Sequence, residues 1–521
     1  MPKYFNTAGP CDPAKHYMIP PERRLPGVRR LIDQQLYFTV HAPRQVGKTT
    51  SFHALAEALT AEGTYAALLT SCEAGQTLEP DAERSVDAVL DTLRQDAEEF
   101  LPQELRPPTT DTRVPAETRL RDLLVRWARQ SPRPVVLFLD EIDALMDEAL
   151  MTVLRQLRSG YRARPRGFPQ AVALIGLRDV RDYRLRARAN PESLGTSSPF
   201  NIKVESLTVR NFGLDEVREL YQQHTQATGR VFTPEASARA FELTGGHPWL
   251  VNALARQAVE ELAPDPATPV SGETIEAAKE ALIERRDTHL DSLIDRLREP
   301  RVRRVFEPIL AGELLAPEVL DDDIQFVRDL GLVASGNGAL AIANPIYREV
   351  IPRALTSVLE ESLPVSRGAY VAGDGRLRFD ALLEDFRAFW CENGEAFLGR
   401  APYSEAAAQL VFMAFLHKIV NGGGFIDREY AVGSGCVDLL IRWPHPGGVE
   451  RFALEIKVWR DSRPDPLPEG LTQLGAYLER LELGEGTLLL FDGRSGAPPL
   501  PGRCASQERE EGGRRIRIMK L

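Results

Sequence analysis

The sequence has few cysteines, and they are widely spaced. Its 521 residues include only five, and no two of them form a Cys-x-x-Cys pair. An odd number of scattered cysteines argues against a disulfide framework and against a structural zinc site. We therefore expect reduced thiols in a cytoplasmic protein.

Long apolar runs are missing as well. No stretch approaches the roughly 18 apolar residues that a membrane-spanning helix needs, so we expect no membrane partner. Residues 1–10 are polar and show no cleavage signature, which predicts that the protein is not secreted. Hydrophobic residues make up 43% of the chain and charged residues 27%, a composition that excludes a mainly disordered protein.

The chain also lacks an excess of basic charge. Lys and Arg total 64 against 75 Asp and Glu, which gives a net charge of −11. Proteins that coat nucleic acid by bulk charge are usually basic, so any contact with nucleic acid must use local patches. One arginine-rich stretch would suit phosphates or a neighbouring subunit, but it is equally compatible with an exposed face paired with acidic side chains. It comprises Arg155, Arg158, Arg162, Arg164 and Arg166.

Apolar runs alternate with helical patterns in the first half of the chain. Near-continuous apolar runs of this length predict parallel strands that are buried on both faces. They lie at residues 36–41, 65–70, 134–140, 171–176 and 202–207. Residues 50–61 have the length and periodicity of a crossover helix. The pattern predicts an α/β fold, with helices on both faces of a parallel sheet.

Helical patterns without strands follow, at residues 234–261 and 274–298. Two further helices, at residues 303–310 and 321–330, precede a short hairpin at residues 331–341 that has Gly-Asn-Gly at its turn. Helices followed by a small hairpin suggest a winged helix. Such a domain binds DNA in some proteins and serves only as a packing module in others, and both roles remain open.

The clearest motif for chemistry follows the first predicted strand. The segment APRQVGKT fits the Walker A pattern, with Ala42 in place of the first glycine. In this motif, backbone N–H groups and a helix N-terminus point at phosphates. Lys48 would reach the β- and γ-phosphates of ATP, and the Thr49 hydroxyl would bind Mg²⁺. The residues expected to contact the nucleotide are Ala42, Arg44, Gln45, Val46, Gly47, Lys48, Thr49 and Thr50.

A second motif lies about 90 residues further on, where an apolar strand ends in Asp140-Glu141. We expect Asp140 to hold the Mg²⁺ shell together with Thr49, and Glu141 to polarise the attacking water. Adjacent carboxylates at a strand end also occur in ordinary solvated turns. The two motifs in this order favour ATP binding and hydrolysis.

The segments HAPRQVGKTT, FLDEID, SPFNI and TGGHPWL resemble the AAA-like ATPases of the archaeal-ATPase and STAND type over about residues 10–350. The resemblance implies a helical lid and assembly into a homo-oligomer. It places Pro248 close to the nucleotide, although a proline also commonly begins a helix. It suggests Arg178 as a sensor residue and identifies no arginine finger. His247 has no companion ligands for a metal, and we interpret it as structural or exposed.

A second group of chemical residues lies after a Pro- and Gly-containing linker at residues 363–375. Strand patterns at residues 436–442 and 451–459 carry Asp438 on one and Glu455 and Lys457 on the other. Because strand side chains alternate between faces, Glu455 and Lys457 project together. If the strands are neighbours, Asp438 and Glu455 can share a divalent cation, while Lys457 orients water or stabilises phosphate charge.

The pattern D-x(16)-E-x-K resembles the PD-(D/E)XK nuclease fold over about residues 376–500, with Val437 in place of the usual proline. The resemblance adds one helix carrying Glu405 and another carrying Gln473 and Tyr477. The same alternation also occurs on solvated strands. However, Asp438 and Glu455 interrupt apolar strands, where an unpaired carboxylate is costly.

Together, the motifs predict four domains: a P-loop ATPase core (1–215), a helical lid (216–295), a winged-helix-like domain (296–362) and an α/β restriction-endonuclease-like domain (376–521). We expect an ATPase that regulates a Mg²⁺-dependent nuclease acting on nucleic acid, most simply DNA. The family resemblance suggests genome defence or mobile-element biology. The alternative is a non-enzymatic ATP-gated scaffold with an inactive nuclease-like domain.

Overall fold

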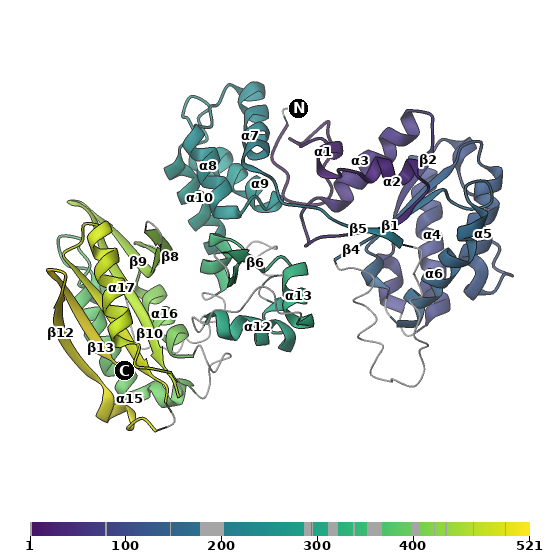
Figure 1. Ribbon diagram of the computed structural model, residues 1–521. Coiled ribbons are helices and arrows are strands. Elements are labelled where there is room, and N and C mark those ends of the chain that lie inside the picture. The colour runs from purple at the N-terminus through teal and green to yellow at the C-terminus, as the bar shows by residue number, and fades with distance from the viewer. Residues whose placement is uncertain are drawn as a thin grey trace. The chain divides into compact units, whose positions relative to one another are not determined.

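The structure is a computed structural model, and the part of the chain that it describes has several gaps. The described residues are 3–78, 81–145, 147–177, 203–285, 293, 295–310, 321–336, 339–351, 367–398, 407–420, 423–432, 435–461, 463–494 and 496–521. The chain divides into two compact units, one formed by residues 1–284 with 328–332 and the other by residues 285–327 with 333–521. Figure 1 labels their elements.

The first unit is built on a five-stranded sheet of order β2-β3-β4-β1-β5. All of its neighbouring strands run parallel. The strands are β1 Tyr37–His41, β2 Ala66–Ser71, β3 Val135–Asp140, β4 Ala171–Gly176 and β5 Lys203–Thr208. The predicted parallel α/β sheet is therefore confirmed, with strand bounds that match the apolar runs to within one residue in the described chain.

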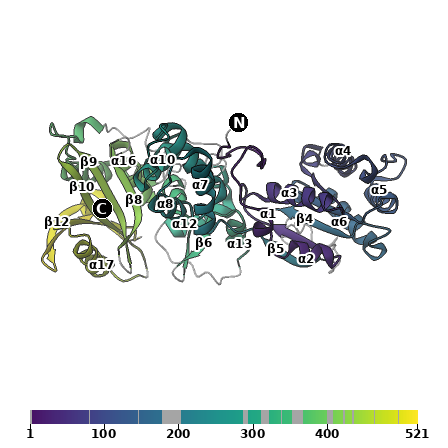
Figure 2. The same ribbon diagram turned by 90° about the horizontal axis from the view of Figure 1, so that it is seen from above.

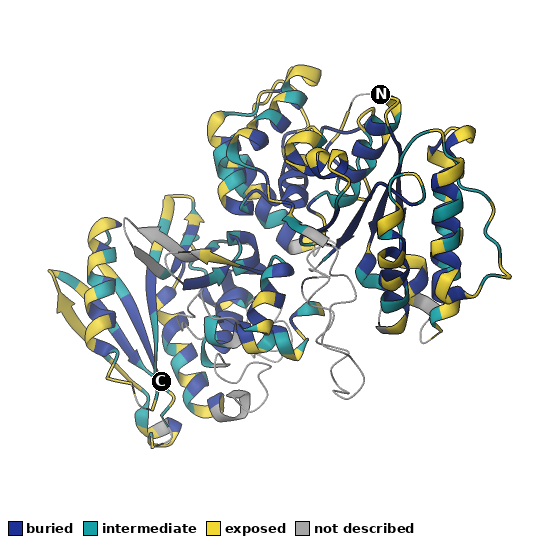
Figure 3. Ribbon diagram, turned by 45° about the vertical axis from the view of Figure 1, so that its right-hand side comes forward, coloured by how far each residue is buried: buried dark blue, intermediate teal, exposed yellow. Residues whose placement is uncertain are grey.

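Alternate residues of this sheet enter two separate cores. Helices α4 (Ala82–Phe100), α5 (Ala116–Gln130) and α6 (Asp147–Gly160) pack on one face, against residues such as Leu68 and Leu137. Helices α2 (Val28–Asp33) and α3 (Lys48–Ala61) pack on the other, against residues such as Val40 and Phe138. Strands buried on both faces read as continuous apolar runs, and Figure 3 shows them as buried ribbon.

Four helices follow the sheet in the same unit: α7 Leu214–Thr228, α8 Pro234–Thr244, α9 Pro248–Gln257 and α10 Gly272–Arg285. The predicted helical stretch 234–261 is interrupted at Gly245 and Gly246, whose positive φ angles of 56° and 72° end α8. A π-helical turn at Ala258–Leu262 extends α9. A short helix, α1 (Pro21–Arg24), precedes the sheet.

The second unit begins with short elements. Helix α12 (Pro300–Leu310) and most of α13 (Asp322–Asp329) precede strands β6 (Val333–Gly336) and β7 (Ala339–Ile342). The two strands pair antiparallel, which confirms the predicted hairpin. The assignment of these elements to a winged helix remains a prediction.

A six-stranded mixed sheet of order β12-β13-β11-β10-β9-β8 forms most of the second unit. Its strands are β8 Phe425–Val432, β9 Gly435–His445, β10 Gly448–Trp459, β11 Glu485–Asp492, β12 Ala505–Glu511 and β13 Arg514–Lys520. Helices α15 (Phe379–Leu398) and α16 (Ala407–Val420) bury one face. Helix α17 (Leu467–Arg480) buries the other, and Figure 2 shows it across the sheet from α16. No helix among the described residues is long and apolar enough to cross a membrane.

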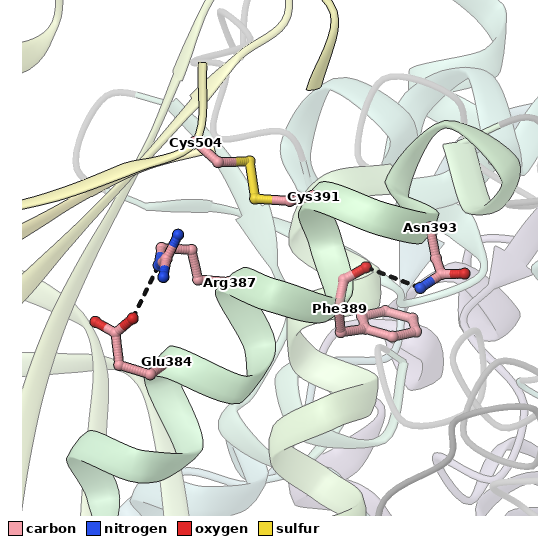
Figure 4. The surroundings of a disulfide bond; sticks show 6 residues. All are labelled: Glu384, Arg387, Phe389, Cys391, Asn393 and Cys504. Atoms are coloured by element: carbon pink, nitrogen blue, oxygen red, sulfur yellow. Dashed lines mark hydrogen bonds and ion pairs between the residues drawn. A yellow bond between two sulfur atoms is a disulfide. The ribbon is translucent and has the colours of Figure 1, made fainter. Parts of the chain in front are cut away.

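One expectation about cysteine is wrong. Cys391 of α15 forms a disulfide with Cys504, which directly follows the short helix α18 (Leu500–Arg503) (Figure 4). The two residues are 113 positions apart, so only the packing of α15 against α18 brings them together. Cys11 and Cys72 are free thiols.

We predict that this disulfide stabilises the second unit. Closing a loop of 113 residues restricts the unfolded chain, and losing such a cross-link typically costs about 2–5 kcal/mol. Cys391→Ser or Cys504→Ser should therefore lower one calorimetric unfolding transition of the full chain, and a reducing agent should do the same to the parent. Cys11→Ser is the matched control. An unchanged transition after reduction would contradict the prediction.

Candidate functional site

The loop between β1 and α3 has the backbone of an anion-binding turn. Gln45 and Gly47 have left-handed φ angles of 59° and 88°, and Gly47 directly precedes α3. The first N–H groups of a helix lack partners within it, so they are available to an anion beside the loop. The segment that the sequence marks as Walker A therefore has the required strand–loop–helix context.

Lys48 lies against the loop from which it would reach phosphates. Its Nζ donates hydrogen bonds to the Ala42 carbonyl at 2.7 Å and to the Pro43 carbonyl at 2.8 Å. Desolvation by the surrounding atoms lowers the pKa of Lys48 to about 8, although the charge of Asp140 opposes this shift. The ammonium group thus donates its hydrogen bonds to loop carbonyls. The charged oxygens of a phosphate would be stronger acceptors than these neutral carbonyls.

Thr49 and Asp140, both expected to bind Mg²⁺, contact each other at the carboxyl edge of the sheet. Strands β1 and β3 pair with opposite sides of β4, and Thr49 Oγ1 donates to Asp140 Oδ2 at 2.5 Å. Asp140 is buried, which raises the pKa of its carboxyl group, and its Oδ1 accepts from the Glu141 N–H at 2.9 Å. A buried carboxylate beside a hydroxyl is a donor set that suits Mg²⁺.

Glu141 has a different environment. It is exposed, has a φ of 52°, and its Oε2 accepts a hydrogen bond from Ser71 Oγ at 3.1 Å. Partial burial, followed by the charge of Glu73, raises the pKa of its carboxyl group. Its side chain therefore lies at the edge of the sheet next to Asp140, accessible to solvent and bound to the end of β2.

The end of β4 packs closely against the residues that follow Asp140-Glu141. A Cβ at Gly176 would lie 2.8 Å from Asp143 Oδ1 and 3.2 Å from Ile142 Cγ2, so only glycine fits without movement. Asp143 also accepts a hydrogen bond from the Leu177 N–H at 3.2 Å. Arg178, the expected sensor, and residues 198–202, part of the resemblance, lie outside the described residues.

Comparisons with known proteins agree with this geometry. Residues 30–183 match the family described as AAA domain. This segment is an AAA-type P-loop ATPase domain. No curated protein matches the chain.

Solved structures resemble the chain only loosely. A Walker-type ATPase of Pyrococcus abyssi is 14% identical with a TM-score of 0.48, covering 67% of this chain and 99% of its own. The RuvB Holliday junction branch migration motor of Thermotoga maritima is 14% identical with a TM-score of 0.34, covering 62% and 91%. Cdc6p of Pyrobaculum aerophilum is 14% identical with a TM-score of 0.36, covering 66% and 94%.

The helices α7–α10, for which we keep the name lid as a label, approach the AAA domain through His247, which the sequence analysis treated as structural or exposed. The His247 side chain is buried and hydrogen-bonds to the backbone of Arg44 in the phosphate-binding loop. Burial, with a contribution from the charge of Lys48, lowers the pKa of His247 to about 4. Pro248 is the first residue of α9. The Gly-His-Pro step therefore contacts the loop through its histidine.

Residues before the family match also contact the AAA domain. Arg24 is 4% exposed, donates to the Val46 carbonyl at 3.1 Å and lies 4.7 Å above the centre of the Phe212 ring. The Cys11 N–H donates to Thr50 Oγ1 at 3.0 Å, so the Thr50 hydroxyl, expected at the nucleotide, anchors the N-terminal segment. No motif identified Arg24, because arginines at the end of a short helix are common and indicate no particular contact.

The N-terminal segment also holds the lid. Trp249, in the first turn of α9, donates from Nε1 to the Thr7 carbonyl at 2.8 Å. The Met18 backbone exchanges two hydrogen bonds with the Gln223 side chain of α7. Tyr17 makes an edge contact with His224. The segment thus bridges the lid and the phosphate-binding helix.

In the second unit, the structure brings together the other predicted residues. Strands β9 and β10 pair antiparallel, with Leu439 opposite Leu454. Continuing this register by one residue brings Asp438 next to Glu455 on the neighbouring strand. Asp438 Oδ2 accepts the Ile456 N–H at 2.7 Å, and Lys457 Nζ donates to Glu455 Oε1 at 2.8 Å. We name this group the carboxylate–lysine cluster: Asp438, Glu455 and Lys457.

The charged groups of this cluster shift one another's pKa values. Glu455 is 2% exposed, and burial together with the nearby charge of Asp438 raises its pKa to about 7. Burial tends to lower the pKa of Lys457, but attraction by Glu455 and Asp438 outweighs it, so the pKa rises. Oε2 of Glu455 is buried and has no hydrogen-bond partner of good geometry among the described residues, although the Asp438 backbone lies close enough to the carboxylate to lower its pKa. A buried acceptor of this kind calls for a donor or a cation.

Helix α17 covers this face of the sheet. A Cβ at Gly470 would lie 3.2 Å from Lys457 Cγ, so the helix passes close to the lysine stem. One turn later, Gln473 donates to Glu469 at 3.1 Å, while its own Oε1 is buried without a partner in the described chain. The described residues contain no group of three or more His, Cys, Asp or Glu that could hold a metal. Glu405 lies outside them.

We predict that Gly176→Ala disturbs the nucleotide site. The added methyl group would contact Asp143 and Ile142, and overpacking of this kind typically costs about 1–3 kcal/mol. Thermal unfolding should show lower stability, and titration with a fluorescent ATP analogue should show weaker binding. Gly272→Ala is the matched control, because its Cβ would meet nothing closer than 3.8 Å. Equal behaviour of the two variants would contradict the prediction.

Proposed function

We propose that this protein is an ATPase whose nucleotide cycle regulates a metal-dependent nuclease in the same chain. The observation that carries the nuclease half of the proposal is the carboxylate–lysine cluster, with its buried and unsatisfied Glu455 oxygen. Nucleic acid is the proposed substrate, and homo-oligomeric assembly and a role in genome defence follow from the resemblance alone.

The AAA domain supplies the parts that ATP hydrolysis needs. Lys48 and the first N–H groups of α3 would hold the phosphates, and Thr49 with Asp140 would hold Mg²⁺. When bound, Mg²⁺ neutralises charge on the phosphate oxygens. Glu141 is exposed beside Asp140, so it is placed to accept a proton from water.

The carboxylate–lysine cluster supports phosphodiester cleavage in a similar way. Mg²⁺ is usually held by only one or two carboxylates plus waters, so Asp438 and Glu455 would form a sufficient set. A divalent cation there would polarise the phosphate and lower the pKa of bound water. Lys457, held by Glu455, would orient that water or stabilise charge on the leaving oxygen.

A structural role explains this cluster less well. Two adjacent carboxylates on neighbouring strands repel each other, and the repulsion is strong in a largely buried place. Proteins rarely retain such an arrangement for stability, whereas perturbed acidic pairs are common at functional sites. The rival is an ATP-gated scaffold whose second unit only binds a partner, and it predicts no cleavage under any condition.

For the ATPase, we predict that two substitutions separate binding from hydrolysis. Lys48→Ala should remove nucleotide binding, because the loop loses its cation. Glu141→Gln should retain binding and lower turnover by about 10²–10⁴-fold, as expected for loss of a general base. Phosphate release and equilibrium binding of labelled ATP measure the two effects. Binding and turnover that survive Lys48→Ala unchanged would contradict the assignment.

For the nuclease, we predict that Asp438→Asn lowers cleavage by at least about 100-fold while ATP hydrolysis stays nearly unchanged. Asparagine can still accept the Ile456 N–H, so the sheet should be preserved. Lys457→Ala should act likewise. Plasmid, linear and single-stranded substrates with Mg²⁺, with and without ATP, provide the assay. The control is Glu485→Gln, a charge loss at an exposed position of β11.

The same assay tests regulation. Free cleavage by a metal nuclease would endanger the host's own nucleic acid, so we expect Lys48→Ala to alter cleavage although it belongs to the other unit. The nucleotide would shift a population between inactive and active states. Equal cleavage by the parent and Lys48→Ala at every nucleotide condition would leave two independent enzymes on one chain.

A further inference from the structure

The arginine-rich stretch noted in the sequence forms an exposed surface at the end of α6. Arg155 and Arg158 are exposed, whereas Gln156 and Leu157 between them are buried. Beyond Gly160, the last residue of α6, a short turn continues the row with the exposed Arg162 and Arg166. We name Arg155, Arg162 and Arg166 the α6 arginine surface; Arg158 is not included, because it interacts with another group of the chain.

One arginine in this stretch has a structural role instead. Arg164 lies 3.5 Å from the centre of the Tyr161 ring and 5.0 Å from that of Tyr37, and it donates to the Tyr161 carbonyl at 2.6 Å. It also donates to the Gln35 carbonyl. These contacts fix the turn that carries Arg162 and Arg166, so the row of exposed arginines has a defined backbone.

Acidic neighbours do not account for the row. Across the described chain, no carboxylate pairs with Arg155, Arg162 or Arg166. Elsewhere in the same unit, exposed arginines such as Arg29 and Arg94 do form ion pairs with glutamate. The helix dipole favours a cation in the last turn of α6, which suits Arg158, but it does not explain arginines beyond the helix end.

We propose that the α6 arginine surface binds the phosphate backbone of nucleic acid. In a chain with a net charge of −11, a row of uncompensated guanidinium groups is complementary to a polyanion. From Arg155 to Gly160 the helix rises by about 7.5 Å, roughly two nucleotide steps of one strand, and Arg162 and Arg166 follow beyond its end. Guanidinium forks match phosphate oxygens, and such contacts position a strand without reading its sequence.

This proposal rests on nucleic acid as the substrate class of the proposed function, but it assigns the contact to the AAA domain rather than to the carboxylate–lysine cluster. Binding here would therefore be independent of sequence and strongly dependent on salt. The other conceivable occupant, an acidic face of a second copy of the chain, would change self-association instead.

The test uses the full-length Asp438→Asn protein, so that binding is measured without cleavage. Arg155, Arg162 and Arg166 are replaced together by alanine. The matched control replaces Arg84, Arg129 and Arg218, three exposed arginines on other helices, with the same loss of charge. Fluorescence anisotropy of a labelled DNA duplex is recorded between about 50 and 200 mM salt, and sedimentation and ATP-analogue binding report assembly and folding.

We expect the α6 triple variant to bind at least about 10-fold more weakly and to lose about 2.7 from the slope of log K against log salt, at 0.9 per phosphate. The control variant should stay near the parent. Equal weakening of both variants, absent binding by the parent, or a change in sedimentation without a change in DNA binding would overturn the proposal.

The two proposals fail in different ways. If the wild type cleaves DNA and the α6 variant binds like the control, the surface assignment is wrong and the nuclease stands. If the wild type never cleaves but binding depends on the α6 arginines, the nuclease is wrong and the surface stands.

Discussion

The parallel pairing of β1 and β3 with opposite sides of β4 is the constraint on which the first unit depends. It brings Thr49 to Asp140 beside the end of β4, where the missing side chain of Gly176 leaves room for Asp143 and Ile142 of the loop after β3. A lysine and a carboxylate thereby share a poorly solvated edge. Their shifted pKa values arise from this burial, and they indicate a site organised for a charged ligand.

The second unit also brings charged side chains together in its interior, but by a different strand topology. An antiparallel hairpin, rather than a crossover, places Asp438 beside Glu455, and the period of two along β10 adds Lys457. Helix α17 then excludes water from the same face. Both sites place acids at the end or in the interior of apolar strands. Burying them is costly, and hydrogen bonds from Thr49, the Glu141 N–H, the Ile456 N–H and Lys457 offset part of that cost.

Local pattern was sufficient to predict much of this arrangement. Continuous apolar runs located all five strands of the first sheet, and alternation located Glu455 and Lys457 on one face. Contacts between distant segments were not predictable in this way. The Cys391–Cys504 bond depends on the packing of α15 against α18, and the contact of His247 with Arg44 depends on the packing of the start of α9 against the loop. Composition and residue spacing carry no information about such contacts between segments that are distant in the sequence.

The N-terminal segment determines how short a fragment of the AAA domain can be while keeping the contacts around its phosphate-binding loop. The family match begins at residue 30, yet Arg24 holds the carbonyl of Val46, and Thr7 and Met18 hold two helices of the lid. A fragment cut at the family boundary would keep every motif residue of the loop while losing a cation and an aromatic contact that support its backbone. Such a fragment would contain the whole motif, but it would lack the N-terminal residues that contact the loop and the helices beside it.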